Sequence, residues 1–599
     1  MASSVVLLAV LSVMGAGAKP FAIRVVDEET GRGVPLVELR TVNEIRQWTD
    51  SAGVAAVDEP GLMGRSVYFQ VSSHGYEYPK DAFGFRGKAI DLVEGGSATL
   101  KVKRVNVAER IYRVTGGGIY RDTILLGEKA PVREPLLNGM VLGQDSVLMT
   151  RYRGKLQWFW GDTNRPGYPL GNFHSPGATS AAPEDGGLDP EVGVDLTYYL
   201  DEKGFARGTA KMPGEGPTWI AGLSAFRDEE GKEQLVAGYS KIRPPMENYE
   251  HGLVVFDPET NEFRKGATFA LDSAIRPLGH TFKGKEGGVE YIYYSTPLPL
   301  TRVRARLGDL KDIRRYEGFT CLETGTRVEE GKLDRGADGA LRYAWRANTP
   351  PMGPGEQAKL IKEGKIKAEE GLLALRDVET GKPIGIHYGS TYWNKFRGRW
   401  VMIAVEAGGS SSYLGEVWWA EGDTPLGPWV YARKIVTHDK YSFYNPKYHP
   451  EFDKEGGRVI FFEGTYTTTF SRQGDATPRY DYNQVMYKLD LADARLNLPV
   501  AVYRLEDGSD GTGAEAMKKA KGAAPVFFAK EREGPGLVGW PEEGKARFYV
   551  VSGEAQGGQV PLWMGEDGLL KVGENGKGRR VGMVWPAPTR VRLPVRDGG

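Results

Sequence analysis

The sequence predicts an all-β protein, and three observations support this fold class. Gly at 81 and Pro at 36 of 599 residues make about a fifth of the chain turn-forming, as expected where short strands are joined by tight turns. Only one stretch, residues 355–370, has a clear helical pattern, and it is charged and amphipathic. Between about residues 110 and 505 one unit recurs, in which a turn with Gly and a basic residue precede an apolar strand that ends at a polar or acidic residue.

The recurring unit predicts the architecture of the middle of the chain. It reads "RGKLQWFWGD", "EEGKEQLVAGYSK", "GGVEYIYYST", "RGRWVMIAVE" and "EGGRVIFFEG", and its copies begin near residues 153, 230, 288, 397 and 456. We interpret these copies as the second strands of about five antiparallel sheets. Such repetition is typical of a β-propeller, here with five blades and long insertions over residues 110–505. A β-sandwich is the alternative, but similar hairpins in one region favour a radial arrangement.

Smaller β modules are expected on either side of this region. In residues 21–105, "DEETGRGVPLVEL" and "TDSAGVAAVDEPG" resemble the transthyretin-like, carboxypeptidase-regulatory-like β-sandwich. The resemblance implies an accessory sandwich, with carbohydrate binding as the alternative role. Short strands such as "KARFYVVSG" predict a β-rich C-terminal segment over residues 525–599, which would be an extra blade, a closure of the ring or an accessory unit.

The beginning of the chain predicts export. An apolar run from Val5 to Met14 precedes the small residues Ala16-Gly17-Ala18, which fits a signal peptide over residues 1–18. The run is too short to span a bilayer, which needs about 20 residues. A buried first strand is the alternative. We therefore expect a periplasmic or extracellular protein without membrane insertion, and its single Cys321 excludes an intrachain disulfide.

Charge and motif content limit the partners. Lys plus Arg equals Asp plus Glu at 78 each, so no global field attracts nucleic acid or an anionic membrane. The seven His residues share no metal-ligand spacing, so we expect no metal or other cofactor at the site, although a structural calcium ion at the channel stays open. The sequence gives no sign of a protein partner.

One hairpin carries the strongest signal for chemistry. A two-residue turn at Arg153–Gly154 pairs Tyr152 with Lys155, so that paired residue numbers sum to 307. This register places Asp145 directly opposite Asp162. Like charges that face each other on an antiparallel pair are destabilising. The pair therefore needs a shared proton, a cation or a catalytic role with shifted pKa values.

Further candidates follow from the same positional logic. Glu406 and Glu463 end the second strands of two other sheets, and acids from separate blades could bracket a sugar. Glycoside hydrolysis needs two carboxyl groups, one protonated and one ionised as base or nucleophile. Residues of the types that bind sugar rings and hydroxyls lie nearby: Trp160, Asn164, Arg165, His174, Tyr444, Asn445 and Tyr466. Packing between blades is the alternative role of Trp160.

These stretches resemble the five-bladed propeller glycosidases of the arabinanase and furanosidase group. The resemblance is carried by "GQDSVLMT" and "AEGDTPLGPW", while "FWGDTN" before a polar loop is similar to the family that includes endo-D-arabinanases. It implies that Asp145 is the base or nucleophile and that Asp162 is a second acid that tunes it. By blade position alone, Glu463 is the expected general acid and Glu406 the second choice; closing turns or making salt bridges is the alternative role for such acids.

The function expected from the sequence is that of an exported glycoside hydrolase that acts on a polysaccharide such as an arabinan-type furanoside. Two alternatives come from other classes. One is a non-catalytic propeller that binds glycan or protein. The other is a polysaccharide lyase or sugar phosphorylase, which would need a strong base or an anion site in place of the acid pair.

Overall fold

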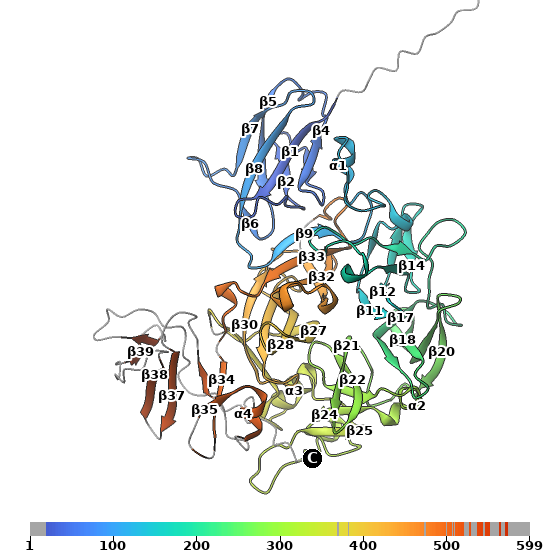
Figure 1. The fold of residues 1–599 in the computed structure, drawn as a ribbon, viewed down its shortest axis with the longest axis vertical. Coiled ribbons are helices and arrows are strands. Elements are labelled where there is room, and N and C mark those ends of the chain that lie inside the picture. Colours follow the sequence, from blue (N-terminus) through green and yellow to red (C-terminus); the bar gives the residue numbers. More distant parts are fainter. Residues whose placement is uncertain are drawn as a thin grey trace, which may run out of the picture. The chain divides into compact units, whose positions relative to one another are not determined.

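The computed structural model of the protein consists mainly of β-strands, with few helices (Figure 1). The structure describes residues 19–367, 370–380, 382–471, 475–498, 500–505, 507, 510–519, 526–528, 536–542, 545–551, 562–564 and 570–572. The predicted signal peptide, residues 1–18, lies outside the described residues, as does most of the predicted C-terminal segment. The all-β fold class is confirmed.

The chain divides into two compact units. Unit 1 contains the described residues up to Ser73, together with Glu77–Lys103 and Tyr120–Ala130, and unit 2 contains the remainder. Unit 1 therefore takes in a segment beyond residues 21–105. That segment carries α1 (Arg121–Leu125), and the Asp50 carboxylate fixes it by accepting hydrogen bonds from Thr123 N at 2.7 Å and Thr123 Oγ1 at 2.8 Å.

Unit 1 has two four-stranded sheets. One has the order β4 (Val54–Val57), β1 (Phe21–Asp27), β8 (Ser97–Arg104) and β6 (Tyr76–Glu77). The other has the order β3 (Arg46–Trp48), β2 (Glu38–Thr41), β5 (Ser66–Ser72) and β7 (Gly87–Asp91). In β5 the apolar residues Val67, Phe69 and Val71 are buried and the residues between them are more exposed, as the two-residue period of a strand requires.

Unit 2 contains five four- or five-stranded sheets, numbered here in chain order. Sheet 1 consists of β11 (Leu148–Tyr152), β12 (Lys155–Phe159), β15 (Gly177–Ser180) and β16 (Thr197–Tyr198). Sheet 2 consists of β17 (Thr218–Arg227), β18 (Glu233–Arg243), β19 (Glu247–Asp257) and β20 (Glu262–Phe269). Sheet 3 consists of β21 (His280–Glu286), β22 (Val289–Ser295), β23 (Thr301–Arg304), β24 (Glu317–Thr320) and β25 (Ala344–Ala347).

The last two sheets each recruit a strand from outside the local sequence order. Sheet 4 consists of β27 (Ile386–Asn394), β28 (Arg399–Glu406), β29 (Val417–Gly422), β30 (Trp429–Val436) and β26 (Leu373–Asp377), which pairs with β30 in parallel. Sheet 5 consists of β31 (Ser442–Tyr448), β32 (Val459–Thr467), β33 (Asn483–Asp490) and β9 (Glu109–Arg113). Strand β9 precedes sheet 1 in the chain, yet it is the outer strand of sheet 5.

The five recurring sequence units are the second strands of these sheets. They contain β12, β18, β22, β28 and β32, and each pairs with the first and third strands of its sheet. The sequence interpretation of these strands is confirmed.

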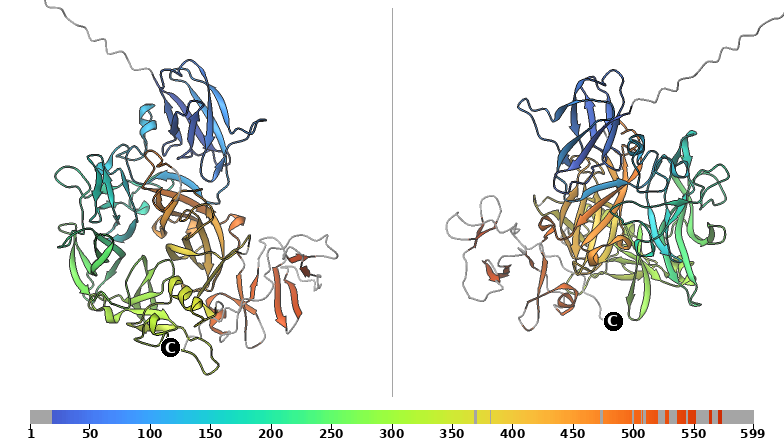
Figure 2. Two further views of the ribbon diagram at one scale, coloured as in Figure 1. Left: turned by 180° about the vertical axis from the view of Figure 1, so that it is seen from behind. Right: turned by 45° about the horizontal axis from the view of Figure 1, so that its top comes forward.

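The five sheets follow one another around a common centre (Figures 1 and 2). Hydrophobic side chains pack between neighbouring sheets. Cores join sheet 1 to sheet 2, sheet 2 to sheet 3, sheet 3 to sheet 4, and sheet 4 to sheet 5. A further core joins sheet 5 to sheet 1, where Met149 and Trp158 pack with Phe461 and Met486. The succession of sheets is therefore closed by side-chain packing.

Helices are few and short. In addition to α1, the structure has α2 (Leu307–Leu310), α3 (Pro354–Lys362) and α4 (Gly513–Lys519). The helix α3 overlaps the predicted helical stretch 355–370: it begins one residue before that stretch and ends at Lys362. Beyond sheet 5 lie β34 (Val500–Arg504), β35 (Asp510–Thr512), β36 (Val526–Phe528), β37 (Gly536–Glu542), β38 (Lys545–Val551), β39 (Leu562–Met564) and β40 (Leu570–Val572).

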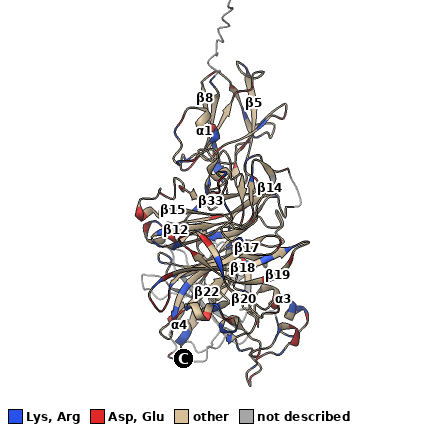
Figure 3. Cartoon of the chain, turned by 90° about the vertical axis from the view of Figure 1, so that its right-hand side faces the viewer, with Lys and Arg blue, Asp and Glu red and all other residues tan. Residues whose placement is uncertain are grey.

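Acidic and basic residues are interspersed along the chain (Figure 3). Ion pairs of exposed residues, such as Arg151 with Asp185 at 2.7 Å, recur on the strands and turns. None of the helices in the described part of the chain is long and apolar enough to cross a membrane.

Candidate active site

The hairpin of sheet 1 places the two candidate aspartates opposite each other. Strands β11 and β12 pair Tyr152 with Lys155, and every pair along them sums to 307. Further along, β10 (Gly143–Gln144) and β13 (Thr163–Arg165) pair Gln144 with Thr163, which keeps the same sum. The register is therefore unchanged across the bend between the two strand pairs, where Asp145 N lies 3.4 Å from Asp162 O. The predicted pairing is confirmed.

Asp145 is held by phenol groups. The Tyr444 hydroxyl, from β31, donates a hydrogen bond of 2.7 Å to Asp145 Oδ2. Burial raises the pKa of Asp145, and the hydroxyls of Tyr444 and Tyr482 act in the opposite direction by favouring the ionised carboxylate. Gly161 leaves the space for this carboxyl group, because a Cβ atom there would lie 2.1 Å from Asp145 Oδ1. Any side chain at position 161 would displace the acid.

Asp162 has a different environment. The Trp219 indole Nε1, from β17, donates a hydrogen bond of 2.8 Å to Asp162 Oδ1. Burial, and secondly the charge of Asp145, raise the pKa of Asp162 to about 7, while the Trp219 hydrogen bond lowers it. Both carboxyl groups are therefore easier to protonate than an exposed Asp, and Asp162 changes its charge near neutral pH.

Backbone conformations around the pair are strained. Ser146, Asn445 and Tyr482 have φ values of +52°, +53° and +62°, in the left-handed region that residues other than Gly rarely adopt. Ser146 and Asn445 are also bonded to each other, since Asn445 Nδ2 donates to Ser146 Oγ at 2.7 Å. Strain of this kind costs about 1–3 kcal/mol per residue and is typical of functional sites.

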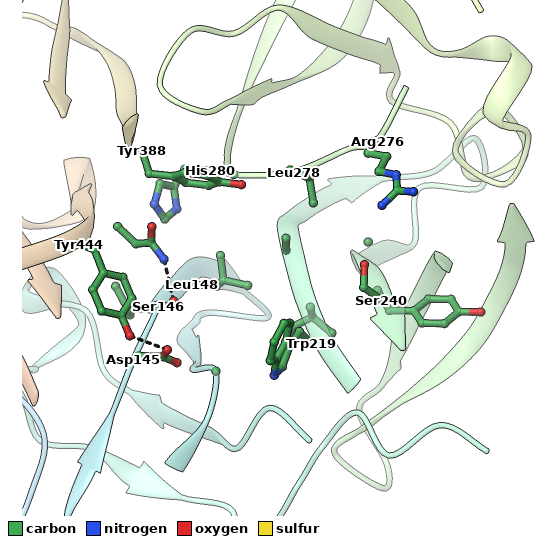
Figure 4. A pocket seen from close by; sticks show the side chains of 18 of the residues that line it. Asp145, Ser146, Leu148, Trp219, Ser240, Arg276, Leu278, His280, Tyr388 and Tyr444 are labelled. Carbon is green, nitrogen blue, oxygen red and sulfur yellow. Dashed lines mark hydrogen bonds between the residues drawn. The ribbon is translucent and has the colours of Figure 1, made fainter. Parts of the chain in front are cut away.

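A cavity of about 720 Å³ opens over the two acids (Figure 4). Its walls come from the beginning of the first strand of each sheet, or from the residues just before it: Ser146, Trp219, His280, Tyr388 and Tyr444 represent sheets 1 to 5 in turn. Because these strands all start at the same end, the cavity lies where the five sheets converge. A volume of this size is typical of a small-molecule or oligosaccharide site.

The cavity wall combines aromatic rings with hydrogen-bonding groups. The aromatic residues are Trp219, Tyr239, Tyr388, Tyr413, Tyr444 and Phe470. The polar residues include Ser146, Ser240, Asn248 and Asn445. The aromatic rings offer flat apolar faces, and the polar side chains offer hydrogen bonds. A sugar has both an apolar face and hydroxyl groups, so it suits this wall.

Glu463 and Glu406 do not line this cavity. Glu463 is fully buried in β32, and its Oε1 lies 2.9 Å from His449 Nε2. Burial raises the pKa of Glu463 to about 8 and lowers that of His449 well below its usual value, so burial favours the neutral form of both groups. Glu406, at the end of β28, accepts a hydrogen bond of 2.8 Å from Trp418 Nε1. Glu406 ends its strand as expected, but Glu463 is in the middle of β32 (Val459–Thr467), so the prediction that it ends a strand at the channel is wrong.

Only two of the seven predicted binding residues line the cavity. Tyr444 and Asn445 line the cavity with the acid pair. Trp160 and Tyr466 are at most 1% exposed and pack against other rings, Trp158 and Tyr441 respectively. Asn164, Arg165 and His174 belong to the strands and loop that follow Asp162 and do not line the cavity; the Arg165 guanidinium lies 5.6 Å from the Phe205 ring. Trp160 thus has the alternative role, packing in the core, and does not bind at the cavity.

Two residues that touch the acids were missed by sequence reasoning. Trp219 follows "GEGPT" at the start of β17, and nothing in that stretch indicates that its indole reaches Asp162. Tyr482 lies in "PRYDYNQ", a stretch whose richness in Tyr was noticed without singling out a residue. The sequence could not predict the positive φ value of Tyr482, because Tyr rarely adopts that backbone conformation.

No metal site is evident among the described residues. They contain no group of three or more His, Cys, Asp or Glu side chains placed to hold a metal ion. The expectation that the site uses no metal or other cofactor stays a prediction, and a structural calcium ion stays an open alternative.

Comparisons with known proteins give remote similarities. No family model and no curated protein matches the chain. Among solved structures it is similar to an exo-β-1,3-galactanase from Phanerochaete chrysosporium, at 9% identity over 74% of this chain and 78% of that one, with a TM-score of 0.31. A GH43_1 enzyme from Xanthomonas citri complexed with xylose matches at 9% identity over 63% and 93%, with a TM-score of 0.29.

A third similar structure is an exo-1,5-α-L-arabinanase from a bovine ruminal metagenomic library, at 11% identity over 63% of this chain and 99% of that one, with a TM-score of 0.29. TM-scores below 0.5 do not establish a shared fold, and identities near a tenth do not establish a shared activity.

Proposed function

We propose that the protein is a glycoside hydrolase that acts on a polysaccharide, with its five sheets as the blades of a β-propeller and its active site at their converging ends. The observation that carries the proposal is the pair of facing carboxyl groups at the cavity, Asp145 and Asp162, whose pKa values are both raised by burial. Glycoside hydrolysis needs a combination of one protonated and one ionised carboxyl group.

The environments assign the roles. Asp162, with a pKa raised to about 7, donates its proton to the glycosidic oxygen as the bond to the leaving sugar breaks. Asp145 acts in its ionised form, which the Tyr444 hydroxyl favours, as the base or nucleophile on the sugar carbon, to which water finally supplies a hydroxyl group. This assignment gives the acid role to Asp162 in place of Glu463, which has no access to the cavity.

The aromatic wall supports a carbohydrate as substrate. Trp219 stands beside Asp162, and the exposed rings of Tyr413 and Phe470 lie at the same cavity. Rings in these places would stack on sugar rings on either side of the bond that breaks. An arabinan-type furanoside stays the first polysaccharide to test, and export through residues 1–18 and an accessory sandwich in unit 1 belong to the same proposal.

The proposal is tested by the release of reducing ends from a panel of arabinans and other glycans. Asp145→Asn should lower kcat by roughly 10²–10⁴-fold without lowering the melting temperature. Asp185→Asn, which removes an exposed carboxylate that pairs with Arg151 and does not line the cavity, is the matched control and should keep full activity.

Other outcomes separate the alternatives. Binding without any product would replace the hydrolase by a glycan-binding propeller. A product with a new double bond, detected by its ultraviolet absorbance, would indicate a lyase, and strict dependence on inorganic phosphate would indicate a phosphorylase. Full activity of Asp145→Asn would remove that residue from the site.

A further inference from the structure

The cavity has one positively charged residue, and it stands apart from the acids. Arg276, in the segment between β20 and β21, is the one Lys or Arg among the described residues that line the cavity. Two of the lining histidines, His251 and His280, are neutral at pH 7 because burial lowers their pKa values. In Figure 4 Arg276 and Ser240 lie on one side of the cavity, and Asp145 and Tyr444 lie on the other.

Arg276 is not the counter-ion of the acid pair. Neither the pKa of Asp145 nor that of Asp162 is lowered by its charge, although a guanidinium within about 4–6 Å would have that effect. No carboxylate of the described residues forms an ion pair with Arg276; its one hydrogen bond goes from Nη2 to the carbonyl oxygen of Leu271 at 3.3 Å. Most of its five donors are therefore free for a ligand.

A second lining residue, which is hydrogen bonded to Ser240 on the same side of the cavity as Arg276, has an acceptor without a partner. Asn248, from β19, lines the same part of the cavity and uses its Nδ2 to donate to Ser240 Oγ at 3.1 Å. Its Oδ1 is buried without any hydrogen-bond partner among the described residues. A buried acceptor left unbonded destabilises the free protein, and a hydroxyl group of a ligand would satisfy it.

We propose that Arg276 and Asn248 form a subsite for a sugar unit that carries a negative charge, as a carboxylate or as a sulfate or phosphate ester. The Arg276 guanidinium binds the anionic group, for which its planar fork of donors is suited, and Asn248 Oδ1 accepts from a hydroxyl of the same unit. The inference rests on the proposed function for the substrate being a glycan. It places the charged unit away from the acids, so that the bond broken belongs to a neighbouring unit.

The subsite is tested by binding, independently of turnover. In the Asp145→Asn background, oligosaccharides of equal length are titrated by calorimetry: one neutral arabinan fragment, one that contains uronic acid and one that carries sulfate esters. Arg276→Gln should weaken binding of the uronic acid fragment or of the sulfated fragment by roughly 10–100-fold and leave the neutral fragment within about twofold. The control is Arg315→Gln, which removes an equal charge from an exposed site outside the cavity.

The outcomes separate this inference from the hydrolase proposal. Equal affinity for all three fragments, or equal loss for all three in Arg276→Gln, would overturn the subsite. Cleavage of glycans by the unmodified protein, together with unchanged binding of both charged fragments in Arg276→Gln, would keep the hydrolase and remove the subsite. Binding of charged fragments that depends on Arg276, with no hydrolysis of any glycan by the unmodified protein, would keep the subsite and remove the hydrolase.

Discussion

The Trp219 indole donates a 2.8 Å hydrogen bond to Asp162 and joins the first strand of sheet 2 to the hairpin of sheet 1. Among the groups around Asp162, this contact favours the charged carboxylate, whereas burial and the charge of Asp145 favour the neutral acid. The pKa of about 7 is the balance of these effects. The proton that the proposed reaction needs is therefore controlled from a neighbouring sheet.

Replacing Trp219 should shift the pH dependence of activity. We expect the activity of the unmodified protein to fall as the pH rises through about 7, because Asp162 then loses its proton. Trp219→Phe keeps a ring but removes the donor that lowers this pKa, so the alkaline limb of the kcat profile should move to higher pH. Trp393→Phe, at an exposed ring on β27, is the control and should leave the limb in place. A shift to lower pH would contradict the role given to the indole.

The two carboxyl groups should titrate as a coupled pair. The charge of Asp145 raises the pKa of Asp162, so Asp145→Asn should lower the pKa of Asp162 below about 7. Carbon NMR of side-chain carboxyl groups labelled in Asp measures this change directly, without turnover. An unchanged Asp162 titration in Asp145→Asn would show that the two groups do not interact.

The space at Gly161 should matter for activity more than for folding. A methyl group at this position would lie 2.1 Å from Asp145 Oδ1, so Gly161→Ala must move the carboxyl group. A displacement of the order of 1 Å in a catalytic group costs about 10²-fold in rate. Gly167→Ala, in the turn between β13 and β14 (Tyr168–Asn172), has nothing within 4 Å and should retain activity. Equal rates of the two variants would contradict the close fit.

Glu463 should lower stability at alkaline pH. Its pKa rises from 4.5 when exposed to about 8 when folded, so the folded state keeps a proton that the unfolded chain releases. Its contribution to stability is thus fully present below about pH 4.5 and is lost as the pH rises through about 8. Glu463→Gln preserves a donor to His449 and removes the ionisable group.

The variant should therefore be more stable than the unmodified protein above pH 8, by about 3–5 kcal/mol from the size of the shift. Thermal melts between pH 5 and 9 measure the difference, with the exposed Glu202→Gln as a control that follows the unmodified protein. Parallel melting curves for Glu463→Gln and the unmodified protein would exclude a buried neutral acid.

Local regularities made part of this molecule predictable from its sequence. Strand periodicity and a two-residue turn at Arg153–Gly154 were sufficient to pair Asp145 with Asp162, because register is transmitted residue by residue along a hairpin. The second strands of the five sheets could be recognised because each follows a similar turn. Such features depend on neighbours in the sequence.

The remainder depends on contacts between distant segments. Trp219 reaches Asp162 from another sheet, and Tyr482 approaches Asp145 from sheet 5 through a backbone conformation that its residue type does not favour. Glu463 ends an apolar run as Asp162 does, but it is covered completely. Whether such a residue is buried or lines the cavity depends on how all five sheets pack together. The pattern of a single strand therefore does not predict it.

The pairing of β9 with β33 sets the order in which unit 2 can be completed during synthesis. Residues 109–113 leave the ribosome long before residues 483–490, so the fourth strand of sheet 5 waits without its partner until sheets 1 to 4 have been made. Contacts so far apart in sequence are slow to form because the intervening loop must close first. A chain that stops before residue 483 lacks β33, so β9 has no partner strand, and the sheet that carries Tyr444 beside Asp145 would stay incomplete.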